Sequence, residues 1–250
     1  MLIDVHCHID DESFERDRDQ VIQRAKDVLI LNAGVDPLSN RKTLEIAEKY
    51  SNVRACLGLH PEFIAKFSDD LITKEIKWIR EHEKQIVAIS EIGLDYYWVK
   101  DESQRIREKD LFRKMLWLAD ELSLPVIIHS REAANDTMTI LSEFRQLRVI
   151  LHGFSEPDSR GYLVSVAPNI YRNKAKQRQV EKLQLKELLT ETDSPLLGIV
   201  PKERNEPANV VKVIDKIAEL KNLQKEEVAQ SISENASRFF GDTIFRSTRE

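Results

Sequence analysis

Short apolar runs, rich in β-branched residues, recur along the chain, and longer amphipathic segments separate them. Runs of this kind are typical of parallel strands that are covered on both faces. They lie at residues 1–7, 27–33, 53–59, 85–91, 125–129, 147–152, 162–167 and 187–193. The pattern therefore predicts eight buried strands.

The segments between these runs have apolar residues at helical spacing. One helix is predicted to begin near Asp69 and Asp70, which are its candidate N-caps. Its apolar face consists of Ile72, Ile76 and Ile79. A second helix follows Ser103, also a candidate N-cap, and two more are predicted to close the chain through residues 210–217 and 228–239.

Eight strands that alternate with helices in 250 residues predict an α/β protein, a (β/α)8 TIM-type barrel. A doubly wound open sheet is the alternative. No internal repeat, low-complexity tract or linker rich in Gly, Ser or Pro interrupts the sequence. We therefore expect a single domain over residues 1–250.

Composition narrows the class of protein further. With 41% hydrophobic and 32% charged residues, the chain has the composition of a globular protein. It has no apolar run long enough to span a bilayer, no signal-peptide pattern at its start and no CxxC pair, since Cys7 and Cys56 stand alone. These features predict a cytoplasmic protein without a membrane partner, and nothing indicates an obligate protein partner.

Charge and glycine content exclude several functions. Neither GxGxxG nor GxxxxGK[ST] occurs, which excludes Rossmann and P-loop nucleotide sites. The 38 Lys and Arg against 43 Asp and Glu give a net charge of −5, which argues against a generally basic surface for nucleic acid. A local positive site remains compatible with this charge.

Candidate metal ligands gather at the ends of the predicted strands. His6 and His8 are two residues apart in a strand, so both side chains face the same side. Barrel enzymes build their active sites at the C-terminal ends of strands. Six residues are predicted at or just past these ends: His6, His8, Glu91, His129, His152 and Asp193. Four imidazoles and two carboxylates suit two divalent ions such as Mg, Mn, Zn or Ni.

The motifs around these residues resemble the TatD family of metal-dependent deoxyribonucleases, which are amidohydrolase-like barrels. The similar segments are His6-x-His8-x-Asp10, Glu91–Asp95, His129–Arg131, His152–Ser155 and Glu191–Pro195, together with Gly58–Pro61. The resemblance implies that His6, His8 and Asp193 hold one ion, that His129 and His152 hold the other, and that Glu91 bridges them. Asp193 would also orient or deprotonate the attacking water.

Candidates for substrate contact lie near the same strand ends. His60 would contact a phosphate or donate a proton to the leaving oxygen, and Arg131 is a second phosphate candidate; a loop histidine and a surface arginine are the structural alternatives. The basic segment 171–178, centred on Arg172, is either a DNA contact or a solvated helix face. Tyr96, Tyr97 and Trp98 are expected to pack a loop rather than stack on bases.

The resemblance favours a two-metal phosphodiesterase that trims single-stranded or frayed DNA from a 3′ end. The alternative is a metal-dependent hydrolase of a small-molecule ester or amide, because the same metal chemistry attacks carbonyl and phosphoryl centres. A third hypothesis, a non-catalytic barrel kept for interactions, predicts loss of some ligands. All six are present, which argues against it.

Overall fold

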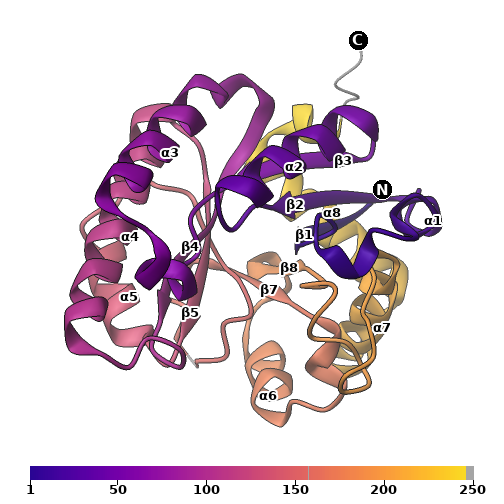
Figure 1. Ribbon diagram of the computed structural model, residues 1–250. Coiled ribbons are helices and arrows are strands. Elements are labelled where there is room, and N and C mark those ends of the chain that lie inside the picture. Colours follow the sequence, from indigo (N-terminus) through magenta and orange to yellow (C-terminus); the bar gives the residue numbers. More distant parts are fainter. Residues whose placement is uncertain (157, 246–250) are drawn as a thin grey trace.

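The computed structural model describes residues 1–156 and 158–245, which form a ring of eight parallel strands surrounded by helices (Figure 1). The strands are β1 (Leu2–Cys7), β2 (Val28–Ala33), β3 (Val53–Leu57), β4 (Ile86–Asp95), β5 (Val126–Arg131), β6 (Val149–Leu151), β7 (Leu163–Val166) and β8 (Leu188–Thr190). Each pairs in parallel with the next along the chain. This order confirms the TIM-type barrel. In a doubly wound sheet, the order of the parallel strands would instead reverse at a switch point. Residues 157 and 246–250 of the expected domain lie outside the described residues.

The helices cover the outside of the ring. They are α1 (Arg18–Arg24), α2 (Pro37–Lys49), α3 (Asp69–Glu81), α4 (Glu102–Leu122), α5 (Ala134–Leu141), α6 (Lys174–Lys182), α7 (Val210–Lys221) and α8 (Lys225–Phe240). Figure 1 shows α3 and α4 side by side on one flank of the barrel and α7 and α8 on the opposite flank. Within the described part of the chain, no helix is long and apolar enough to cross a membrane.

The N-caps of α3 and α4 are not the residues that the sequence predicted. Ser68 caps α3, because its hydroxyl accepts from the Leu71 backbone N–H at 3.2 Å, and Asp69 and Asp70 lie in the first turn. Asp101 caps α4 and accepts from the Gln104 N–H at 3.0 Å, with Ser103 inside the helix. A cap has extended backbone just before the first helical residue, and the sequence alone did not identify which polar residue takes that conformation.

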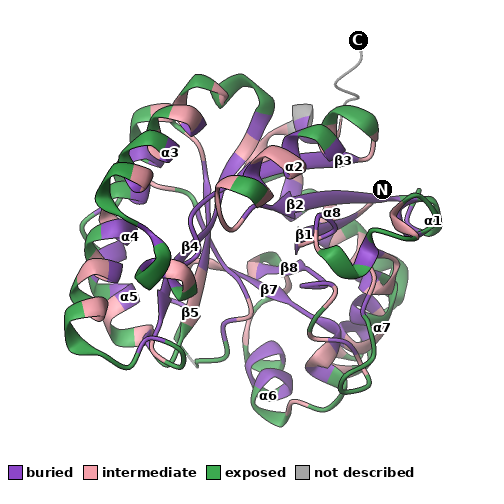
Figure 2. Ribbon diagram, viewed as in Figure 1, coloured by how far each residue is buried: buried purple, intermediate pink, exposed green. Residues whose placement is uncertain are grey.

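The apolar core lies between the strands and the helices, and Figure 2 shows the strands mostly buried. Phe112 and Met115 of α4, for example, belong to the same buried cluster as Ile89 and Ile128 of the sheet. The inside of the ring toward the C-terminal strand ends instead holds polar side chains. The core thus fixes the barrel, and the barrel places those polar groups together.

The ring is completed between β1 and β8 by individual hydrogen bonds instead of a regular ladder. The Thr190 hydroxyl donates to the Ile3 carbonyl at 2.5 Å, and the Thr192 N–H donates to the Asp4 carboxylate at 2.8 Å. Past the strand ends, the Asp193 N–H donates to the His6 carbonyl at 2.9 Å. The first and last predicted ligand segments are therefore joined directly.

Candidate metal centre

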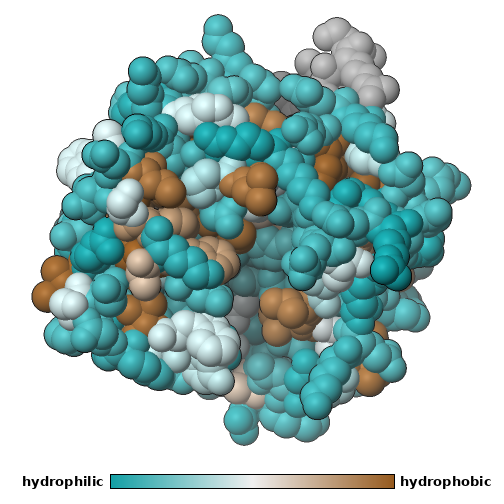
Figure 3. Space-filling view, in the orientation of Figure 1, coloured by the Kyte–Doolittle hydropathy of each residue, from teal (hydrophilic) through white to brown (hydrophobic). Residues whose placement is uncertain are grey.

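The six predicted ligands meet at the C-terminal ends of the strands. Figure 3 shows the surface in the orientation of Figure 1, with a hollow near its centre. His6, Glu91 and His129 lie in β1, β4 and β5, and the other three lie in the segments just after β1, β6 and β8. Their side chains are at most 15% exposed. The barrel therefore gathers residues that are up to 187 positions apart in sequence into one buried cluster.

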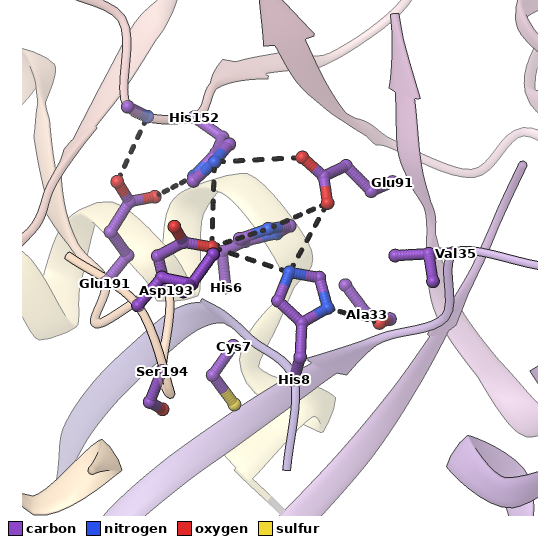
Figure 4. Close-up of polar contacts among 12 residues, drawn as sticks. His6, Cys7, His8, Ala33, Val35, Glu91, His152, Glu191, Asp193 and Ser194 are labelled. Carbon is purple, nitrogen blue, oxygen red and sulfur yellow. Dashed lines mark hydrogen bonds and ion pairs between the residues drawn. The ribbon is translucent and has the colours of Figure 1, made fainter. Parts of the chain in front are cut away.

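Figure 4 shows Glu91 between His152 on one side and His6 and His8 on the other. Its Oε2 is 3.4 Å from both His6 Nε2 and His8 Nε2. Its Oε1 is 2.9 Å from His129 Nδ1 and 3.7 Å from His152 Nε2. His60 Nε2 also lies 3.4 Å from Oε1. The two carboxylate oxygens thus face different sets of imidazole nitrogens, which is the arrangement that a bridging carboxylate needs.

Asp193 approaches the cluster from the β8 side. Its Oδ1 is 3.4 Å from His8 Nε2, 3.7 Å from His6 Nε2 and 3.9 Å from His152 Nε2. The residue has a φ of 53°, in the left-handed region that aspartate tolerates better than most residues. The bond from its N–H to His6 holds this turn and aims the carboxylate inward.

The donor set fits a divalent metal ion on the evidence of His6. Both ring nitrogens of this fully buried imidazole lack a hydrogen-bond partner among the described residues. A buried polar atom without a partner is costly, and a metal ion at Nε2 would remove this cost at that atom. Three overlapping groups place ligand atoms within 4.8 Å of one another: His6, His8 and Asp193; His6, Glu91 and His152; and His60, Glu91 and His129.

Outer hydrogen bonds orient three of the histidines. His8 Nδ1 lies 2.9 Å from the Ala33 carbonyl, His129 Nε2 lies 2.9 Å from Asp95 Oδ2, and His152 Nδ1 lies 2.7 Å from Glu191 Oε2. Such partners fix the ring and leave the other nitrogen for a metal. Asp95 and Glu191 stand inside the motifs Glu91–Asp95 and Glu191–Pro195, but the sequence assigned them no role.

The electrostatics of the cluster are strongly coupled. Burial would raise the pKa of Glu91, but the neighbouring imidazoles of His60 and His6 and a hydrogen bond from His129 hold that pKa well below its usual value. Burial would lower the pKa of His129, but hydrogen bonds to Asp95 and Glu91 raise it to about 10. Carboxylates and imidazoles therefore stabilise one another's charges, as expected of a site built for cations.

Glu91 does not end its strand as the sequence predicted, because β4 continues to Asp95. The pairing of β4 with β5 shifts register between Ile89 and Ile92, so Glu91 leaves the regular ladder and its N–H donates to the Gly34 carbonyl at 3.0 Å. Gly58 permits this path, since a Cβ there would lie 2.6 Å from the Glu91 backbone. The ligand is thus set by an irregularity inside the strand.

His60, predicted as a substrate contact, lies directly against the ligand cluster. Its Nε2 is 3.4 Å from Glu91 Oε1, and its Nδ1 accepts from the Glu62 N–H at 3.2 Å. Because Nδ1 accepts, the proton of a neutral ring resides on Nε2. His60 therefore presents an N–H donor to the cluster.

Arg131 and Arg172, the two arginines predicted to contact substrate, have different surroundings. Arg131 ends β5 and stacks on Tyr97, with its guanidinium carbon 3.7 Å from the ring centre. Arg172 is exposed beyond β7 and donates to the Gly198 carbonyl at 3.4 Å. Between Arg172 and Arg178, Lys176 is buried, so this basic segment is not a uniformly solvated face.

The aromatic residues after β4 differ from the expectation that they pack a loop. Tyr96 is partly buried and its hydroxyl donates to Asp136 at 2.5 Å. Tyr97 and Trp98, however, are 40% and 57% exposed. The expectation is right for Tyr96 and wrong for the other two, because the turn directs them outward.

A parallel eight-stranded barrel with a buried cluster of histidines and carboxylates at its strand ends defines a metal-dependent hydrolase of the amidohydrolase-like type. Residues 3–241 match the family described as TatD related DNase. The chain belongs to this family, and it is a metal-dependent hydrolase.

Individual relatives agree with this assignment. The chain is 36% identical over 247 residues to an uncharacterized metal-dependent hydrolase of Methanocaldococcus jannaschii, covering 95% of this chain and 96% of the relative. It is 32% identical over 258 residues to the human deoxyribonuclease TATDN3, covering 96% and 94%. Its fold is similar to the crystal structure of YjjV, a TatD homologue of Escherichia coli, with a TM-score of 0.87, 30% identity and coverage of 96% and 97%.

Proposed function

We propose that this protein is a two-metal-dependent deoxyribonuclease that hydrolyses phosphodiester bonds and removes nucleotides from the 3′ end of single-stranded or frayed DNA. The observation that carries the proposal is the position of Glu91, whose two oxygens face different sets of histidine nitrogens. The name of the human relative supports DNA as the substrate.

The ligands divide between two sites around Glu91. His6, His8 and Asp193 would hold one ion, His129 and His152 the other, and Glu91 both. When bound, two divalent ions such as Mg, Mn, Zn or Ni supply positive charge and Lewis acidity at a phosphoryl group. The net charge of −5 then matters little, because the attraction for DNA is local.

The chain's own groups perform the proton transfers. Asp193 orients the attacking water, and one of its carboxylate oxygens accepts the proton of that water. His60 holds a proton on Nε2 at the edge of the cluster, where it donates to a phosphate oxygen or to the leaving oxygen. Arg131 and Arg172 contact other phosphates of the bound DNA strand, which lie further from the ligand cluster.

The test begins with protein purified without chelator and analysed for metal content. End-labelled single- and double-stranded DNA should then be shortened stepwise from the 3′ end, and EDTA and Glu91→Ala should each abolish the reaction. Glu121→Ala is the matched control, because this exposed glutamate pairs only with Arg80 in the described structure. Bound metal without cleavage of any nucleic acid would overturn the proposal and favour a small-molecule ester or amide as substrate.

A further inference from the structure

Two exposed aromatic rings and an arginine form a small platform beside the metal centre. The rings of Tyr97 and Trp98 lie edge to face, with centres 4.9 Å apart. The guanidinium of Arg131 lies 3.7 Å above the Tyr97 ring and 5.9 Å from the Trp98 ring.

The platform is joined to the ligand cluster through one carboxylate. Asp95 Oδ1 accepts from the backbone N–H groups of Tyr97 and Trp98, at 2.9 and 3.0 Å. Its Oδ2 lies 2.9 Å from His129 Nε2. The turn that carries the aromatic rings is therefore fixed relative to a candidate metal ligand.

Arg131 has the properties of an anion contact. It follows His129 by two residues in β5, so alternation directs both side chains to the same side of the strand. Its guanidinium is exposed and forms no ion pair with any residue that the structure describes. An arginine that stacks on an aromatic ring keeps the N–H groups at its edge free for a phosphate.

We propose that Tyr97, Trp98 and Arg131 form a stacking subsite for an unpaired nucleobase of the strand whose phosphate lies at the metal centre. Arg131 covers one face of Tyr97, and Trp98, which is 57% exposed, offers its ring to the base. Aromatic rings with arginine are the combination by which proteins hold single strands without sequence preference. Duplex DNA would not enter in this way, because its bases are already stacked. This inference rests on the proposed function and specifies its substrate as a strand with an unpaired end.

The test compares Trp98→Ala with Trp117→Ala. Trp117 is a matched control, since it is also exposed, at 63%, but lies toward the end of α4. There its ring packs edge to face against Phe144. The substrates are a single-stranded oligonucleotide, the same strand with abasic residues at its last two 3′ positions, and bis(p-nitrophenyl) phosphate, which has no base. For Trp98→Ala we expect the ratio of kcat/KM on the oligonucleotide to that on bis(p-nitrophenyl) phosphate to fall about tenfold. In the same variant, kcat/KM should become equal for the oligonucleotide with bases and the oligonucleotide with abasic residues at its 3′ end.

A second measurement does not depend on turnover. A phosphorothioate-linked oligonucleotide with 5-iododeoxyuridine near its 3′ end, irradiated with the protein, should crosslink to Tyr97 or Trp98 in peptide mapping. Arg131→Gln serves as a second variant if Trp98→Ala lowers the thermal stability, and it should weaken the crosslink.

The outcomes separate the two proposals. If the wild type cleaves DNA while Trp98→Ala and Trp117→Ala show the same substrate ratios, the subsite is wrong and the deoxyribonuclease assignment stands. A crosslink only to residues outside the platform would also overturn the subsite. If the wild type hydrolyses bis(p-nitrophenyl) phosphate but no DNA, the proposed function fails, and the subsite fails with it.

Discussion

At the scale of single residues, the protein depends on carboxylates behind the candidate ligands. Glu191 is fully buried and accepts from His152 Nδ1 at 2.7 Å and from the Gly153 N–H at 3.0 Å. Asp95 holds His129 in the same way. These residues set which ring nitrogen faces the centre, so their effect passes through the histidines and not through contact with substrate.

Glu191→Gln should therefore weaken metal binding. The amide is a poorer acceptor for the His152 N–H than a carboxylate, and loss of such a partner commonly costs 10- to 100-fold in metal affinity or activity. We expect a loss of that size in affinity, measured by competition with a chromophoric chelator. Glu187→Gln, on the exposed turn before β8, is the control. Unchanged metal affinity in Glu191→Gln would show that His152 needs no such partner.

The buried carboxylate of Glu108 makes part of the protein's stability depend on pH. Burial raises the pKa of Glu108 to about 7, although its carboxylate accepts from the Asp95 N–H. Because the pKa is higher in the folded than in the unfolded state, the folded protein binds the extra proton. The contribution of Glu108 to stability is therefore greatest below about pH 4.5 and falls as the pH rises toward 7.

Glu108→Gln removes this titration but keeps an oxygen for the Asp95 N–H. Relative to wild type, the variant should gain on the order of 1–2 kcal/mol in unfolding free energy between pH 5 and pH 8. Urea denaturation of both proteins at each pH measures the difference, and groups common to both cancel. Parallel pH profiles of the two proteins would contradict the expectation.

At the scale of elements, the close approach of β3 and β4 positions Glu91. A Cβ on Gly58 would lie 2.6 Å from the backbone nitrogen and oxygen of Glu91 and from the Ser90 carbonyl carbon. Backbone atoms cannot move aside as a flexible side chain does. The space at Gly58 is thus part of what places the Glu91 carboxylate, the candidate bridging ligand.

Gly58→Ala should accordingly separate the two strands. We expect a loss of about 1–3 kcal/mol in unfolding free energy together with weaker metal binding. Gly198→Ala is the matched control, because the nearest atom to its new Cβ would be the Glu203 carbonyl oxygen at 3.3 Å. Equal stability of the two variants in urea denaturation would show that β4 adapts to the extra methyl group.

At the scale of the whole molecule, bound metal should hold the barrel together. The candidate ligands come from β1, β4 and β5 and from the segments after β1, β6 and β8, so the cluster joins distant parts of the ring. Without a cation, Glu91 and Asp193 share a buried space with imidazoles that are only partly hydrogen-bonded.

Chelation should therefore lower the Tm. An ion at 1,000 times its Kd adds about 4 kcal/mol of stability, which corresponds to a shift of about 10 °C for a chain of this size. Scanning calorimetry with and without EDTA measures the shift, and recovery of the Tm when divalent metal is added in excess over the EDTA is the control for the chelator itself. A Tm independent of both EDTA and added metal would argue that the cluster is not a metal site.

The sequence by itself determined the eight strands and the six candidate ligands. Both depend on local properties, namely the periodicity of apolar residues and the placement of His, Glu and Asp at the ends of the runs. The tertiary structure alone decided how these groups relate. It placed Glu91 at a register shift inside β4, turned its two oxygens toward different histidines, and set the Asp95 carboxylate between the His129 ring and the backbone N–H of Trp98. These relations are distances between segments far apart in the chain, and they arise only when the barrel closes and packs.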